Sequence, residues 1–143
     1  MVNDVNERIA LQNQYNSQQT QLNQCSWQLV SLNDKIESIK ILKGKFIDLK
    51  NDLLDLKSKL NEESRESHKY WKGQLLQDHN DLFKSSLVNG SLSTYIKNVD
   101  RNLDDLNNEL MRLQNEVYST EGLIGKIKSS LNWIATKLDN LVN

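Results

Sequence analysis

Aliphatic residues recur at alternating steps of four and three positions along the second half of the chain. The positions are Leu92, Ile96, Val99, Leu103, Leu106, Leu110, Leu113, Val117, Thr120, Ile124, Ile127, Leu131, Ile134, Leu138 and Leu141. Fourteen of these fifteen are aliphatic. A mean spacing of 3.5 residues keeps side chains on one side of an α-helix, where a stripe this long is buried against another helix. The pattern predicts a long helix over about residues 92–141.

The first half of the chain carries a similar apolar seam with one fault. Its members are Leu11, Tyr15, Gln18, Leu22, Cys25, Leu29, Leu32, Ile36 and Ile39, followed by Leu42, Phe46, Leu49, Leu53, Leu56 and Leu60. The step from Ile39 to Leu42 repeats a three-residue interval, which is a stammer that overwinds a coiled coil. Because Gly44 lies beside it, we expect a bend or a softened turn there. The first helix is predicted over about residues 4–64.

The segment between the helices, about residues 65–91, has a different pattern. It begins charged, continues through Trp71-Lys72-Gly73, and then carries a short apolar-patterned stretch. Asn89-Gly90 is typical of a chain reversal or a helix stop, because both residues tolerate positive φ. We therefore predict an all-α, single-domain chain over residues 1–143, folded as an elongated antiparallel helical hairpin with a short helical tip segment. The alternative is one continuous rod that dimerises in parallel.

A hairpin of this kind has a testable register. If Leu60 lies near Leu92, the numbers of opposed residues add to about 152. Leu11 then faces Leu141, and Trp27 faces the neighbourhood of Gly122 and Gly125, although Trp27 falls at an outward heptad position. At that level of the hairpin we expect the large side chain of Trp27 to pack against the small glycines of the other helix.

Composition excludes several classes of protein. The chain has 18 basic and 19 acidic residues, no proline and one cysteine, which argues against a nucleic-acid binder, a disulfide scaffold or a cysteine-based zinc site. No apolar run is long enough to enter a membrane, and the N-terminus lacks the pattern of a cleaved signal peptide. Cys25 is interpreted as a small buried hydrophobe, with a reactive thiol or intermolecular disulfide as the alternative.

No catalytic or cofactor chemistry is indicated. His68 and His79 are eleven residues apart, whereas two metal ligands on one helix need spacings of three or four. The paired carboxylates and the absence of a glycine-rich phosphate loop give no active-site pattern. We expect neither enzymatic activity nor a metal or other cofactor.

The mid-chain Trp71-Lys72-Gly73 between two long helices resembles the WXG family of small secreted helical-hairpin proteins. With its longer, heptad-rich arms the chain is most similar to the YwqH-like proteins associated with LXG toxins in Gram-positive bacteria. On this comparison Trp71 and Gly73 form the motif. A tryptophan at a helix turn can bury its ring while its N–H finds a carbonyl, and a glycine lets the backbone turn. The two residues either fold the tip or also contact a partner.

The resemblance implies export by, or service to, the type VII secretion system. It implies binding to the N-terminal helical domain of an LXG toxin, to a second small helical protein, or to both, as a targeting factor or chaperone. It also implies a cytoplasmic protein exported without a cleaved signal peptide. The chain departs from the pattern in two respects. The aromatic residue that follows the Trp-X-Gly is Phe83, twelve residues after Trp71. Tyr118 is followed by Ser119, Thr120, Glu121 and Gly122, so the C-terminal Tyr-X-X-X-Asp/Glu export motif is absent in that form.

Several apolar residues lie outside the two seams and are candidates for partner contact. They are Trp27, Val30, Met111, Tyr118, Leu123 and Trp133. A two-helix hairpin has one internal interface, so residues off that interface indicate a second one with another helical chain. The alternative is packing around the rim of the same seam. As a whole-protein alternative, the chain is a self-associating structural coiled coil, such as a tether or phage component, with a homodimer as its assembly.

Overall fold

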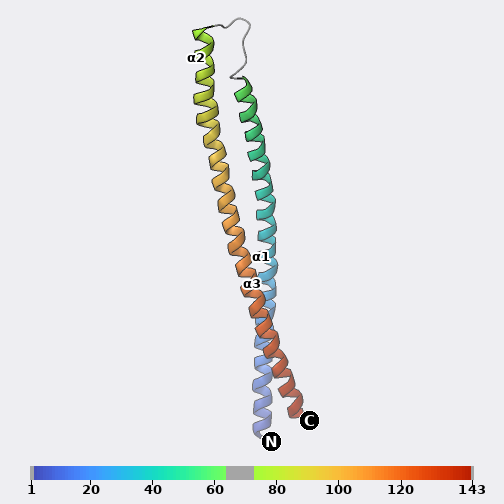
Figure 1. Ribbon diagram of the computed structural model, residues 1–143. Helices are drawn as coiled ribbons and strands as arrows, with labels where there is room; N and C mark the ends of the chain where they lie inside the picture. Colours follow the sequence, from blue (N-terminus) through green and yellow to red (C-terminus); the bar gives the residue numbers. More distant parts are fainter. Residues whose placement is uncertain (1, 64–72, 143) are drawn as a thin grey trace. The chain divides into compact units, whose positions relative to one another are not determined.

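A computed structural model describes residues 2–63 and 73–142, and apart from Gly73 all of them are helical. Helix α1 spans Val2–Glu63, α2 spans Gln74–Leu82, the π-helix η1 spans Phe83–Leu92 and α3 spans Ser93–Val142 (Figure 1). The all-α class and the two long helices are as predicted. Of the Trp-X-Gly motif the structure describes Gly73 alone, and Trp71 lies outside the described residues.

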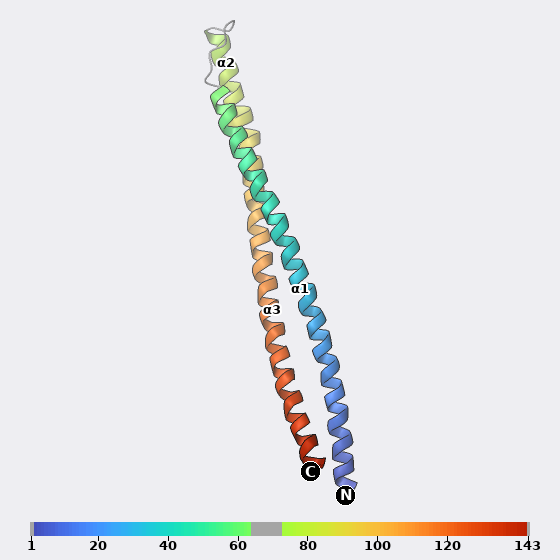
Figure 2. The same cartoon turned by 90° about the vertical axis from the view of Figure 1, so that its right-hand side faces the viewer.

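The chain divides into two compact units, in each of which a segment of α1 lies antiparallel beside a segment of α3. The terminal unit comprises Met1–Ser38 and Met111–Asn143, and the central unit comprises Ile39–Leu110. Figure 1 shows the paired segments of the central unit running next to each other, and Figure 2 shows those of the terminal unit. The predicted antiparallel hairpin is therefore confirmed as the pairing of α1 with α3.

The core of the terminal unit follows the predicted seams of both helices. Cys25 packs with Ile127 and Leu131, and the partly buried Tyr15, Leu22 and Ile124 pack against this cluster. Leu113 and Ile134 are almost completely buried. Cys25 is a free, buried cysteine, so its interpretation as a small core hydrophobe is confirmed.

In the central unit the predicted stammer is wrong. The half-buried positions of α1 continue without a fault from Ile39 to Leu60, through a set in which every second member is a lysine: Lys43, Phe46, Lys50, Leu53 and Lys57. Leu42, Leu49 and Leu56, which the sequence pattern had placed in the seam, remain 43%, 43% and 44% exposed. Lysine can line a seam because its aliphatic stem is buried while its ammonium group reaches water. Helix α1 also continues through Gly44 without interruption.

The predicted register is confirmed in both units. In the central unit Lys50 Nζ lies 2.6 Å from Asp100 Oδ1, a pair whose numbers add to 150. In the terminal unit Cys25 packs with Ile127, a pair whose numbers add to 152. The proposed packing of Trp27 on glycine is wrong, because Trp27 is 75% exposed and a Cβ added at Gly122 or Gly125 would meet nothing within 4 Å.

The predicted chain reversal at Asn89-Gly90 is also wrong. Both residues lie inside η1, and the backbone stays helical from Gln74 to Val142. Gly90 does not have positive φ, unlike Gly73. At the end of η1, Ser93 Oγ donates to the carbonyl of Val88, five residues earlier, at 2.9 Å. Each hydrogen-bonded turn of a π-helix holds one residue more than a turn of an α-helix.

The wider turns of η1 change which side of α2 is covered by the rest of the chain. Counted back from Leu92 in an uninterrupted α-helix, the seam would pass through Asn89, Leu82 and Leu75. Instead Val88 is fully buried and Phe83 and Leu76 are half-buried, while Leu75 and Leu82 are each 65% exposed. The π-helix thus brings Leu76, Phe83 and Val88 to the covered side and leaves Leu75 and Leu82 outside it.

Candidate partner-binding surface

The six predicted contact residues all project from the surface of the terminal unit. Their exposed fractions lie between 49% for Leu123 and 75% for Trp27. The set comprises Trp27 and Val30 on α1 and Met111, Tyr118, Leu123 and Trp133 on α3. Packing within this chain therefore leaves about half or more of each side chain accessible to water.

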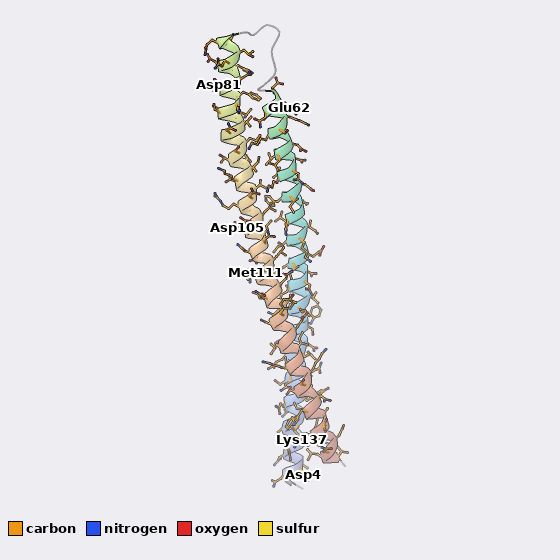
Figure 3. The ribbon with its side chains drawn as sticks, in the orientation of Figure 1. Asp4, Glu62, Asp81, Asp105, Met111 and Lys137 are labelled. Carbon is orange, nitrogen blue, oxygen red and sulfur yellow. The ribbon has the colours of Figure 1, made fainter. Side chains whose placement is uncertain are left out.

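Met111 and Tyr118 share one face of α3, because residues seven apart lie on the same side of a helix. Figure 3 labels Met111 on this helix. Continuing from them at alternating steps of four and three gives a stripe of exposed positions, here named the outer stripe. Its members are Met111, Asn115, Tyr118, Gly122, Gly125, Ser129, Asn132 and Thr136.

The outer stripe contains no charged residue over eight successive positions, although 26% of the chain is charged. Water-facing positions of a coiled coil normally carry charged side chains. At Gly122 and Gly125 the helix backbone is open, with nothing within 4 Å of an added Cβ. An uncharged stripe with glycines at coiled-coil spacing is a surface on which a second helix can approach closely.

Trp133 lies beside the outer stripe, and Leu123 flanks the buried seam of α3, so neither belongs to the stripe. Lys137, labelled in Figure 3, places its Nζ 5.5 Å from the centroid of the Trp133 ring. A cation over an indole face is a favourable contact of roughly 0.5–1 kcal/mol at an exposed site. It holds the ring against its own helix while leaving more than half of it exposed.

Trp27 lies on a different side of the terminal unit. Cys25 and Leu32 on α1 face the core, and the position of Trp27 between them is on the side of the helix turned away from α3. The outer stripe is likewise on the side of α3 turned away from its own buried seam. The six candidates therefore form two surfaces that face apart, and no single straight helix can contact both.

The sequence analysis found the large members of the outer stripe and missed its small ones. Gly122 and Gly125 were predicted to pack against Trp27 within the hairpin, not to line an outer surface, and Ser129 has no apolar side chain to mark it. The available signal was a 4-3 periodicity in the absence of charge. That signal is visible in the sequence once the seam has fixed which positions face water.

The terminal unit also has two small open grooves near the ends of its helices. One of about 190 Å³ is lined by Gln12, Tyr15, Ala135, Leu138 and Asp139. The other, of about 240 Å³, is lined by Asp4, Val5, Arg8 and Leu141. Both are below the size of typical small-molecule sites, and neither gathers a nucleophile with a base.

Within residues 2–63 and 73–142, no three histidine, cysteine or acidic side chains come together in a way that would hold a metal ion. His79 instead stacks on Phe83, with ring centroids 5.9 Å apart, and His68 lies outside the described residues. None of the helices, over their described residues, has an apolar stretch long enough to cross a bilayer.

Comparison with known proteins gives one match. A family model described as YwqH-like matches residues 7–136, nearly the whole chain. No curated protein matches, and no solved structure matches.

Proposed function

The chain belongs to the YwqH-like family, and from that membership we propose that it is a non-enzymatic accessory or substrate of type VII secretion, of the WXG-like kind. Its partner is the N-terminal helical domain of an LXG toxin, a second small helical protein, or both. It accompanies that partner to the secretion machinery as a targeting factor or chaperone, and is itself exported from the cytoplasm. It uses no cofactor.

The outer stripe is the observation that supports partner binding most directly. A charge-free face that begins with Met111 and Tyr118 and continues over open glycines matches an amphipathic partner helix with bulky apolar residues opposite Gly122 and Gly125. Such burial removes apolar surface from water at roughly 25 cal/mol per Å². Trp27 and Val30, on the other side of the unit, supply a contact for a second helix of the same partner.

The experiment is co-purification and calorimetric titration with an LXG N-terminal domain encoded beside the gene. Gly122→Gln places a long side chain in the outer stripe, where nothing in this chain obstructs it. We expect it to weaken binding by roughly tenfold or more, because the partner backbone is pushed away. Gly44→Gln is the matched control, since Gly44 is also helical and open but lies in the central unit.

Separate Trp27→Gln and Trp133→Gln variants then show which side of the terminal unit the partner occupies. Both residues are exposed, so helicity by circular dichroism should stay at the wild-type level. If both variants lose binding to the LXG N-terminal domain, the partner contacts both sides of the terminal unit. Undiminished binding by Gly122→Gln and by both tryptophan variants would show that this surface is not the contact.

A further inference from the structure

The central unit carries an exposed leucine stripe that the fold does not use. Leu42, Leu49 and Leu56 occur at intervals of seven on α1 and keep 43%, 43% and 44% of their surface exposed. They adjoin the seam on the side opposite to Asp100, because Lys50 reaches Asp100 on the other flank. A leucine at every seventh position, next to an existing helix interface, is the pattern of a second helix-packing surface.

From this stripe we infer that α1 packs against α1 of a second copy of the chain, antiparallel, about a two-fold axis at Leu49. In that arrangement Leu49 meets Leu49 of the second copy, and Leu42 meets Leu56 in both directions. A two-fold interface has to be complementary to itself. The equal spacing of the three leucines satisfies this requirement.

Charge supports a second copy over other helical occupants. The exposed positions next to the stripe on its outer side are Lys45 and Asp52, three residues after Leu42 and Leu49. When Leu49 lies on the axis, Lys45 of each copy falls opposite Asp52 of the other. The sequence thus provides two opposite-charge pairs related by the same axis. Pairs of this kind fix the orientation and register of helix partners.

The α3 side of the stripe is compatible with a neighbouring helix. By the observed register, Leu56 lies across from Tyr95 and Leu49 across from Asn102. Tyr95 is 66% exposed, and its ring extends the apolar surface to α3. Three half-exposed leucines and one tyrosine make a small interface, so we expect a weak dimer with a dissociation constant of roughly 10 μM.

Sedimentation of the purified chain between about 1 and 100 μM tests the inference without any partner. Leu49→Gln should raise the dissociation constant by roughly 10- to 100-fold, since both copies lose the central contact. Ile47→Gln is the control, because Ile47 is 41% exposed but falls on the Asp100 flank, and it should leave dimerisation unchanged.

A charge exchange gives the sharper test. Lys45→Asp and Asp52→Lys should each weaken self-association, because like charges then face each other. Mixing the two variants should restore the dimer as a heterodimer, in which both pairs are again of opposite sign. A folding defect in either variant would not produce this recovery.

A wild-type chain that stays monomeric at 100 μM overturns the inference, as does a dimer indifferent to Leu49→Gln and to the charge exchange. A monomer whose Leu49→Gln variant loses binding to the LXG domain also overturns it and assigns the stripe to that partner. Failure of this inference leaves the proposed function intact, because the outer stripe lies in the terminal unit.

Discussion

At the scale of single residues, the seams of the terminal unit contain two polar side chains with different surroundings. Thr120 is buried among aliphatic neighbours. Gln18 is half-buried, and its Oε1 is shielded from water with no hydrogen-bond partner. By the observed register it lies opposite Ile134, which is fully buried. A shielded amide oxygen without a donor costs roughly 1–3 kcal/mol, so Gln18 weakens the terminal unit where its packing is tightest.

Gln18→Leu should therefore stabilise the chain by about 1 kcal/mol or more. Leucine removes the unsatisfied oxygen and adds apolar surface to the seam. Urea unfolding monitored by circular dichroism measures the change. Gln19→Leu is the control, because Gln19 adjoins the seam without belonging to it. A destabilised Gln18→Leu chain would show that the amide has a hydrogen-bond donor in solution.

At the scale of elements, the glycines of the helices differ in what surrounds them. Gly44 and Gly122 face open space, whereas a Cβ at Gly90 would meet the backbone oxygen of Ser85 at 3.2 Å, closer than ordinary contact. Gly73 begins α2 with φ 68° and ψ −138°, a conformation essentially restricted to glycine. The helix start at Gly73 and the wide turn at Gly90 therefore depend on glycine for two different reasons.

Alanine substitutions should separate these roles. Gly44→Ala should stabilise the chain by about 0.5–1 kcal/mol, since alanine is the better helix former and meets no obstacle. At Gly90 the same gain is opposed by the approach to Ser85, so Gly90→Ala should be neutral or destabilising. Thermal unfolding of both variants at one protein concentration provides the comparison. Equal stabilisation at both positions would show that η1 readily becomes an ordinary α-helix.

The elements also show where the sequence was sufficient and where it was not. The 4-3 spacing of aliphatic residues from Leu92 to Leu141 predicted α3 and its buried face. In α1 the same reasoning followed Leu42, Leu49 and Leu56 and missed the lysines one position later, because pattern counting treats lysine as a surface residue. The chain reversal at Asn89-Gly90 was inferred from turn propensity, which packing of Val88 and Leu92 overrides.

At the scale of the whole molecule, the burial of α1 is uneven along its length. Leu11, Cys25, Leu32 and Ile36 are buried, and all four belong to the terminal unit. Between Ile39 and Glu63 no residue of α1 reaches the same burial, since lysines occupy every second seam position. The terminal unit could be anticipated from the 4-3 spacing of its two mostly apolar seams. The partner surfaces could not, because a single chain does not reveal which exposed side chains another molecule covers.

Amide hydrogen exchange should show this difference directly. We expect peptides from residues 42–60 to exchange faster than those from residues 11–36, because fewer buried contacts oppose local opening. Mass spectrometry of the intact chain after timed labelling and digestion measures it. Replacing Lys43, Lys50 and Lys57 together with leucine should slow exchange in residues 42–60 and leave residues 11–36 unchanged. Uniform protection along α1 would contradict this account.

The π-helix at Phe83–Leu92 has a consequence for how such a chain can diverge. If the wide turns closed into an ordinary α-helix with every residue kept, all residues before them would rotate about the helix axis relative to α3. Leu75 and Leu82 would move inward and Phe83 outward, without a change in any of the three. Among descendants of this gene, substitutions in that stretch that favour one winding over the other would decide which side of α2 faces outward, with the sequence of α2 itself unchanged.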